Sequence, residues 1–486
     1  MKILVVASEC VPFAKSGGLA DVIGALPKHI RKRGHDVRIV LPKYKTINSR
    51  QFGLKPVRKF SVQMGGDVEQ AQVYRSILGN VTVYFIGNKN FFDRDELYRT
   101  SGGDYHDNAQ RFIFFSKAVM ELAKAEAFKP RIIHCNDWQT GLIPAYIKTL
   151  YNYDSFFSET KTVYTIHNLA YQGLFPKNIM PVTGIGWDQF TPDKMEYWGQ
   201  VSFMKAGLVY SDIITTVSKT YSREIQSSKE FGRGMEGVLA SRFRDIYGIL
   251  NGVDYEDWNP SGDTIIASNY SLKDVASGKA ICKNDLARDT GLSFGEDIPF
   301  IAMISRLDPQ KGFDIVVEAI ESIMSLDIKF ILLGRGDEIY HKTFEKISRK
   351  HPEKVSVHFT FNDSLAHKIY AGADMLLMPS HFEPCGLGQL IAFKYGTIPI
   401  VYKTGGLADT VNAHNSPKKT SKGFIFDKYT PSALLDTVKK AIEVYADKKK
   451  WKKLVNSAMR SDFSWDRPAA EYEALYKKLA SRKRRR

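Results

Sequence analysis

Short apolar runs of strand length recur along the chain, separated by polar or glycine-rich segments. The runs lie at residues 3–7, 37–41, 132–133, 163–166, 300–304, 330–333, 375–378 and 398–402. Between the first two runs, apolar residues recur at helical spacing. These positions are Leu19, Val22, Ile23, Leu26 and Ile30, and Gly34 is placed to end the helix. Apolar runs that alternate with helices are typical of parallel sheets covered on both faces, so the pattern predicts an α/β fold that begins with a βαβ unit.

An eight-residue motif occurs twice in the chain. Residues 15–22 read KSGGLADV, and residues 403–410 read KTGGLADT. Each copy follows a predicted strand and is predicted to open a helix. The repeat therefore indicates two Rossmann-like halves, each with a Gly-Gly turn at a helix N-terminus. The polar stretch 251–263, which contains proline and glycine, is the predicted boundary between them.

Polar clusters follow most of the predicted strands directly. They lie at residues 14–18, 135–138, 167–168, 305–312, 334–337 and 380–386. Ligands bind at the carboxyl ends of the strands in open parallel sheets. Two such edges brought together would form a cleft lined by these groups, so the sequence predicts a site between two domains.

The chemistry of these clusters suits a diphosphate. Gly-Gly turns let backbone N–H groups approach phosphate oxygens, and a helix N-terminus adds partial positive charge. Lys15, Arg306 and Lys311 supply full charges. The chain has no Walker motif, no GxGxxG after the first strand and no clustered metal ligands, which disfavours phosphoryl and hydride transfer. A leaving diphosphate held by Lys and Arg, without a metal, remains.

Each polar residue also has a structural alternative. Asp137 could cap a helix that begins at Trp138, and Glu383 could be a first-turn acid before Pro384. Further alternatives are a surface position for Lys311, a satisfied core position for His167, first-turn positions for Asp21 and Asp409, and simple packing for Cys135 and Cys385. The coincidence of so many groups at strand ends favours the functional interpretation.

Composition narrows the class of protein further. The chain has 486 residues, 43% hydrophobic, with 69 Lys plus Arg against 53 Asp plus Glu and only 4 Cys, which excludes a disordered chain and a disulfide scaffold. Part of the net charge of +16 lies in residues 448–453 and 482–486, which we interpret as solvated surface rather than a nucleic-acid site. Without a long apolar run or a leader, the sequence predicts a soluble cytoplasmic protein.

Six segments, in order along the chain, resemble the signatures of bacterial glycogen synthases and plant starch synthases. They are residues 11–22, 165–173, 249–254, 305–312, 379–387 and 394–410. The resemblance implies a GT-B architecture, with two Rossmann-like domains at 1–254 and 255–463 facing across a cleft. Residues 464–486 would form a helix that crosses back to the first domain, followed by a basic tail.

The same resemblance implies a retaining glycosyltransferase. It would transfer glucose from ADP-glucose to the non-reducing end of an α-1,4-glucan such as glycogen and release ADP. No metal or other cofactor, nucleic acid or membrane partner is expected. The acceptor hydroxyl would attack the face that the diphosphate leaves, with the diphosphate as the base.

Residue roles also follow from the resemblance. Arg306 and Lys311 would hold the diphosphate, Glu383 would contact the glucose near its anomeric centre, His167 would position that sugar, and Asp137 would orient the sugar or the acceptor. The remaining expected donor-binding residues are Lys15, Gly17, Gly18, Asp21, Phe361, Ser380, Cys385, Gly386, Leu387, Gly405 and Gly406.

Some positions depart from the pattern of the resembled family. Residues 136–139 read Asn-Asp-Trp-Gln where the family often has His-Asp-Trp-His, Gly388 replaces a common Thr, and Phe361 takes the place of a stacking Tyr. Ile391 stands where sucrose- and trehalose-type relatives carry a second Glu, which disfavours that class. Three alternatives stay open: a UDP-glucose donor, another acceptor, or a catalytically silent glucan- or nucleic-acid-binding relative.

Overall fold

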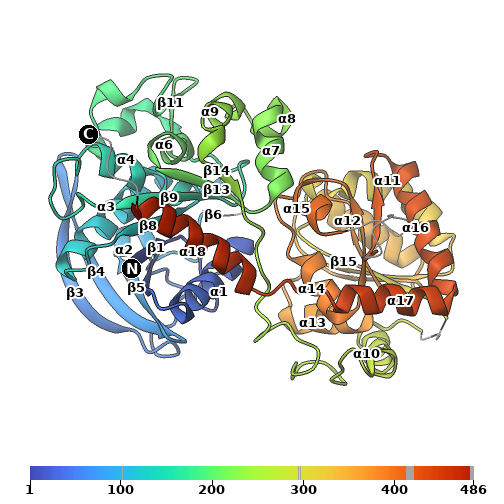
Figure 1. Ribbon diagram of the computed structural model, residues 1–486. Helices are drawn as coiled ribbons and strands as arrows, with labels where there is room; N and C mark the ends of the chain where they lie inside the picture. Colours follow the sequence, from blue (N-terminus) through green and yellow to red (C-terminus); the bar gives the residue numbers. More distant parts are fainter. Residues whose placement is uncertain (101, 294, 296, 412–420, 482–486) are drawn as a thin grey trace. The chain divides into compact units, whose positions relative to one another are not determined.

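The computed structural model describes residues 1–100, 102–293, 295, 297–411 and 421–481. The chain divides into two compact units. The first unit comprises Met1–Asn251 together with Trp465–Arg486, and the second comprises Gly252–Ser464. Each unit is an α/β structure built around its own sheet (Figure 1).

The described part of the first unit has a large sheet in the order β14-β13-β9-β8-β1-β2-β5-β4-β3. Its strands are β1 (Lys2–Val6), β2 (Asp36–Pro42), β3 (Lys55–Met64), β4 (Asp67–Leu78), β5 (Val81–Gly87), β8 (Ile132–Asn136), β9 (Lys161–Ile166), β13 (Ile213–Thr216) and β14 (Ile246–Gly248). The strands from β14 to β5 are parallel, and their pairing sets Val5 opposite both Ile39 and His134. The antiparallel strands β3 and β4 extend the sheet beyond β5.

Helices cover the parallel part of this sheet. The main ones are α1 (Gly18–Lys32), α3 (Asn108–Ala125), α4 (Leu142–Lys148), α6 (Phe203–Tyr210), α7 (Lys219–Ser227) and α18 (Asp466–Ser481). Shorter elements are α2 (Lys89–Phe92), β6 (Arg99–Thr100), β7 (Gly103–Asp104), β10 (Leu174–Pro176), α5 (Met180–Thr183), β11 (Glu196–Tyr197), β12 (Gln200–Ser202), α8 (Lys229–Gly232) and α9 (Glu236–Ser241). The predicted helix between the first two strands is confirmed as α1, and all five of the apolar positions that predicted it are buried.

The C-terminal helix α18 packs within the first unit, beside α1 (Figure 1). Glu473 of α18 accepts hydrogen bonds from Arg33 at 2.6 Å and binds His35 at 3.1 Å. Tyr476 lies 2.7 Å from Nδ1 of His134 on β8. Lys477, Arg33 and His35 lower the pKa of Glu473 to about 2, so this carboxylate stays charged at the contact with α1. Residues of the predicted basic tail, 482–486, lie outside the described residues.

The second unit contains a parallel sheet in the order β17-β16-β15-β18-β19-β20. Its strands are β15 (Phe300–Ile304), β16 (Lys329–Leu333), β17 (Val355–His358), β18 (Met375–Met378), β19 (Ile398–Tyr402) and β20 (Phe424–Phe426). Its helices are α10 (Val275–Thr290), α11 (Phe313–Met324), α12 (Glu338–Lys350), α13 (Asp363–Gly372), α14 (Gly388–Tyr395), α15 (Gly405–Thr410), α16 (Pro431–Ala446) and α17 (Lys448–Met459). The predicted strands 300–304, 375–378 and 398–402 are confirmed to the residue.

Both copies of the repeated motif open a helix after a strand, as predicted. The helix α1 begins at Gly18, and α15 begins at Gly405, directly after β19. Asp21 lies in the first turn of α1, which confirms that position. Asp409 lies outside the first turn of α15, so the matching prediction for Asp409 is wrong.

The lysine-rich run near the C-terminus lies on the protein surface. The lysine-rich run 448–453 forms the start of α17, where its lysines are exposed, so its interpretation as solvated surface is confirmed. In the described part of the chain, none of the helices is both long and apolar enough to cross a bilayer.

Candidate active site

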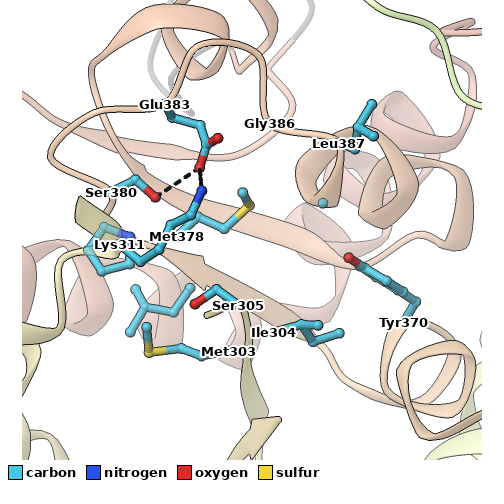
Figure 2. A pocket seen from close by; sticks show the side chains of 13 residues that line it. Met303, Ile304, Ser305, Lys311, Tyr370, Met378, Ser380, Glu383, Gly386 and Leu387 are labelled. Atoms are coloured by element: carbon cyan, nitrogen blue, oxygen red, sulfur yellow. Dashed lines mark hydrogen bonds and ion pairs between the residues drawn. The ribbon is translucent and has the colours of Figure 1, made fainter. Parts of the chain in front are cut away.

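The second unit has an open cavity of about 160 Å³ at the carboxyl ends of β15 and β18 (Figure 2). Its lining consists of residues 303–305, 377–380 and 386–388 together with Lys311, Tyr370 and Glu383. Parallel strands end at the same edge of their sheet, so residues distant in sequence meet there. Five of the predicted site residues line this one cavity: Lys311, Ser380, Glu383, Gly386 and Leu387.

A partly buried ion pair dominates the cavity. Nζ of Lys311 lies 2.7 Å from Oε2 of Glu383, and the Ser380 hydroxyl donates to the same oxygen at 3.1 Å (Figure 2). The side chains of Lys311 and Glu383 are only 19% and 9% exposed. The helix that follows begins at Gly388, so the alternative of Glu383 as a first-turn acid is wrong. Likewise, Lys311 is not a solvated surface lysine.

The loop that carries Lys311 is held against the Glu383 loop by close packing. A Cβ at Gly312 would lie 2.2 Å from the carbonyl oxygen of Pro379, and the φ of Gly312 is +79°, a conformation that favours glycine. The short helix η5 (Pro309–Lys311) is capped by Asp308, which accepts from the Gln310 N–H at 2.8 Å. The side chain of Gln310 donates to the Phe382 carbonyl at 3.0 Å. These contacts fix Lys311 beside Glu383.

The second Gly-Gly turn supports this loop from the other side. A Cβ at Gly405 would lie 2.0 Å from the Glu383 carbonyl oxygen, and one at Gly406 would lie 1.9 Å from the Cys385 carbonyl oxygen. The Gly406 N–H donates to the Glu383 carbonyl at 3.0 Å. Glycine is therefore required at both positions by the close approach of two backbones.

The other expected residues of the second unit lie around this centre. Arg306 follows β15 directly and is exposed. Cys385 is buried beside the cavity, in agreement with a packing role. Phe361 is 68% exposed on the segment before α13 and does not line the cavity. Sequence reasoning missed Tyr370, which lines the cavity from the last turn of α13, because a helical position among apolar residues gave no motif to detect.

In the first unit, Asp137 follows β8 in a strained backbone conformation. Its φ of +54° with ψ of −178° lies in a region that is essentially restricted to glycine. Oδ1 of Asp137 accepts the His167 N–H at 2.8 Å. The helix η1 (Trp138–Thr140) receives no capping bond from this side chain among the described residues, so the capping alternative is wrong. Burial raises the pKa of the Asp137 carboxyl to about 7, although N–H groups of His167 and Asn168 favour the charged form.

His167 follows β9 and lies beside Asp137. Its ring Nε2 is 2.9 Å from Oδ1 of Asn136. The side chain is partly exposed rather than fully enclosed, while its Nε2 has the partner that a satisfied histidine requires. Burial lowers the pKa of His167 to about 3, which makes the ring neutral at physiological pH. The carboxyl ends of β8 and β9 thus present a neutral imidazole next to a carboxyl group that titrates near neutrality.

The first Gly-Gly loop is organised by Glu9, which sequence reasoning did not identify. The Glu9 carboxylate accepts the Ser16 N–H at 2.5 Å, the Ser16 hydroxyl at 2.7 Å, the Gly17 N–H at 3.2 Å and the Tyr98 hydroxyl at 2.7 Å. Glu9 is only 4% exposed. The available signal was its place shortly after β1, the position that singled out the other polar clusters.

Lys15 and Gly18 lie on either side of this bonded segment. Nζ of Lys15 pairs with Oδ1 of Asp21 at 2.8 Å, and both side chains are more than a quarter exposed. Gly18 begins α1, where the N–H groups of the first turn lack partners within the helix and favour an anion. A Cβ at Gly17 would meet no atom within 4 Å. The loop is therefore accessible to a ligand, although the N–H groups of Ser16 and Gly17 already donate to Glu9.

The cysteines lie in the protein interior. The four cysteines are free and buried, and burial raises the pKa of Cys135 well above the usual range of a thiol, in agreement with packing. Over the described ranges of the chain, no group of three His, Cys, Asp or Glu side chains is arranged to hold a metal ion.

Two α/β units, each with a parallel sheet and polar clusters at its strand ends, agree with the expected pair of Rossmann-like domains. Residues 2–241 match the family described as starch synthase catalytic domain, and residues 289–458 match glycosyl transferases group 1. The chain is 48% identical over 486 residues to a glycogen synthase of Geotalea daltonii, and 44% identical over 485 residues to glycogen synthase 2 of Geobacter sulfurreducens, with 100% of each chain covered. It belongs to the family of glycogen and starch synthases, which confirms the resemblance.

Solved structures agree with this assignment. The catalytic domain of starch synthase IV from Arabidopsis thaliana, bound to ADP and acarbose, matches with a TM-score of 0.93 and 33% identity over 99% of each chain. Sucrose-phosphate synthase from Thermosynechococcus elongatus matches with a TM-score of 0.61 and 16% identity over 98% of each chain, which shows the fold alone.

Proposed function

We propose that this protein is a glycogen synthase that transfers glucose from ADP-glucose to the non-reducing end of an α-1,4-glucan, with retention of configuration and release of ADP. The observation that carries the proposal is the Lys311–Glu383 pair in the cavity of the second unit. Family membership supports the reaction class, and the neighbour bound to ADP and acarbose supports an adenine nucleotide and a glucan-like ligand.

The pair provides the two charges that this reaction needs. A leaving diphosphate requires cations, and an oxocarbenium-like sugar centre is stabilised by a nearby carboxylate. Lys311 and Glu383 neutralise each other across 2.7 Å. A diphosphate would compete for Lys311 and release Glu383 to face the sugar. Each charge-assisted hydrogen bond to the leaving group contributes about 1.5–3 kcal/mol.

The other roles are extensions of the same proposal. Arg306 assists Lys311 in holding the diphosphate, and Lys15 with the α1 N-terminus binds it as well. His167 and Asp137 orient the sugar. Phe361, being largely exposed, is available to stack on adenine. The diphosphate itself takes the proton of the attacking acceptor hydroxyl, and no metal is required.

The test is incorporation of labelled glucose into glycogen from ADP-glucose and, in parallel, from UDP-glucose. We expect incorporation from ADP-glucose, unchanged by a metal chelator, into material that an exo-acting enzyme specific for α-1,4 linkages releases. Preference for UDP-glucose would overturn the donor assignment, and transfer only to a different acceptor would overturn the acceptor assignment. No transfer from either sugar nucleotide would favour a silent binding protein.

A further inference from the structure

We propose that Asn136 is a positioning residue that holds His167 as the tautomer protonated on Nε2, so that Nδ1 offers a lone pair to a hydroxyl of the transferred sugar. The first part concerns only the protein. The second part rests on the proposed function, because it requires a sugar at His167.

The amide of Asn136 has a defined orientation. Asn136 is fully buried at the end of β8, and its Nδ2 donates to the Val6 carbonyl of β1 at 3.1 Å and lies 3.4 Å from the His134 carbonyl. Carbonyl oxygens only accept hydrogen bonds. If the amide turned over, Oδ1 would face two carbonyl oxygens and every bond would be lost. Nδ2 therefore points to Val6, and Oδ1 points to His167.

This orientation determines which ring nitrogen carries the proton. Oδ1 of Asn136 lies 2.9 Å from Nε2 of His167 and can only accept, so Nε2 must donate. The ring is neutral because burial lowers its pKa to about 3, and a neutral imidazole carries one proton. Nδ1 is then the acceptor. The bond from the His167 main-chain N–H to Asp137 fixes the same residue at its backbone, so Asn136, the last residue of β8, and Asp137, which follows it, hold His167 at its ring and at its backbone.

The amide at position 136 limits His167 more than a histidine at the same position would. A histidine there could donate or accept, depending on its own tautomer, whereas an amide held by Val6 can only accept toward His167. In this chain, Nδ1 of His167 can therefore only accept a hydrogen bond from the ligand. The sugar hydroxyl must donate, which a hydroxyl can do and a fluorine cannot.

The first experiment reads the tautomer directly in the intact, unsubstituted protein. Histidine labelled at its ring nitrogens is followed by nitrogen–proton correlation NMR, and the His167 signals are assigned from their loss in His167→Gln. We expect a protonated Nε2 and an unprotonated Nδ1 from about pH 6 to about pH 8. A ring protonated on Nδ1, or a charged ring at neutral pH, would overturn the proposal. This readout requires no activity, so it stands even if the proposed reaction is wrong.

The second experiment tests the consequence for the ligand. Deoxyfluoro analogues of ADP-glucose, each lacking one hydroxyl donor, are compared by their binding affinity without acceptor, so that the effect of fluorine on the reacting carbon does not enter. We expect one analogue to lose about threefold to tenfold in the unsubstituted enzyme, the effect of one hydrogen bond, and Asn136→Ala to lose that discrimination. Ser116→Ala, a buried hydroxyl in α3, is the matched control and should retain it. Equal discrimination in Asn136→Ala would show that Asn136 does not position His167.

Asn136→Asp adds a result that a purely structural role does not predict. A carboxylate facing Nε2 favours the charged imidazole, so the His167 pKa should rise toward neutrality and add an inflection to the pH profile of kcat/KM. If Asn136→Asp does not fold, the tautomer measurement on the unsubstituted protein still decides the question.

Discussion

The two copies of the Lys-x-Gly-Gly motif have nearly the same sequence but different surroundings. In the first unit, the loop is accessible, a Cβ at Gly17 would meet nothing, and Lys15 pairs with Asp21 of the same motif. In the second unit, Gly405 and Gly406 are packed against the Glu383 loop, and Lys403 pairs with Asp427 outside the motif. The repeat predicts local structure, a strand followed by a turn and a helix, but the residues around each copy decide its use.

The two units also carry different side chains at the carboxyl ends of their strands. The second unit joins a cation and a carboxylate in one cavity, Lys311 with Glu383. The first unit instead sets the neutral His167 beside Asp137, in a hydrogen-bond network supported by Asn136. The Lys311–Glu383 pair of the second unit suits a charged leaving group. The His167–Asp137 network of the first unit suits the hydroxyls of a sugar.

The largest expected difference between the two turns is in stability. Gly406→Ala places a Cβ against the Cys385 carbonyl, so we expect the free energy of unfolding to fall by about 3 kcal/mol or more. Gly17→Ala fills open space at an extended residue and should change it by less than about 0.5 kcal/mol. Denaturant unfolding of both variants checks this, and equal losses would remove the distinction between a packing turn and an accessible loop.

The two lysines of the repeat should differ in their effect on the donor. Lys15→Ala should raise the KM for ADP-glucose about tenfold or more, because a charge-assisted bond to the diphosphate is lost. Lys403→Ala is the matched control, since this lysine is 60% exposed and pairs only at the surface; it should change KM less than about twofold. Steady-state kinetics with varied donor distinguishes them. A similar rise in both variants would contradict the assignment.

Replacing Glu9 should weaken binding of ADP-glucose, because this carboxylate holds the first Gly-Gly loop. In Glu9→Gln, an amide NH₂ replaces one acceptor oxygen and faces N–H and hydroxyl donors, so the loop should loosen and KM for ADP-glucose should rise about fivefold with a smaller change in kcat. Tyr98→Phe removes one of the donors to Glu9 and should cause a smaller rise. If calorimetry finds normal ADP affinity in Glu9→Gln, the loop does not depend on this carboxylate.

The smallest predicted effect is the pH dependence of stability due to Asp137. Its folded pKa of about 7 lies above the ordinary value of 3.8, so the folded state holds the proton more tightly and stability falls as pH rises between these values. Asp137→Asn cannot titrate and keeps the acceptor for His167. We expect it to gain about 1 kcal/mol relative to the unsubstituted protein on going from about pH 6 to about pH 7, the interval just below the folded pKa. Parallel unfolding curves at both pH values would contradict this.

The sequence predicted the fully buried strands well and the partly exposed ones poorly. The strands 300–304, 375–378 and 398–402 carry continuous apolar runs and were predicted to the residue. The strands β3 and β4 expose many of their residues at the edge of the sheet and offer no such run, so they were missed.

For the site, strand-end position was informative, whereas partners were not predictable. The position after a strand identified Lys311 and Glu383 as candidates but gave no indication that they pair. The two residues are 72 positions apart, and their contact depends on loop packing at Gly312 and Gly405. The capping alternative for Asp137 failed because its side chain turns to the neighbouring strand end. The acceptor role of Asn136 follows from Val6, which belongs to another strand of the sheet.

The central claim is that Lys311 and Glu383 carry the transfer of glucose, and the turnover of Lys311→Ala at saturating ADP-glucose tests it most directly. Lys311→Arg, which keeps the charge, controls for exposure of an unpaired Glu383, and unfolding curves confirm that each variant is folded. The account predicts that Lys311→Ala loses at least about a hundredfold in kcat, equivalent to about 2.7 kcal/mol of leaving-group stabilisation, and that Lys311→Arg retains part of it. Near-normal turnover in a folded Lys311→Ala variant would contradict the account.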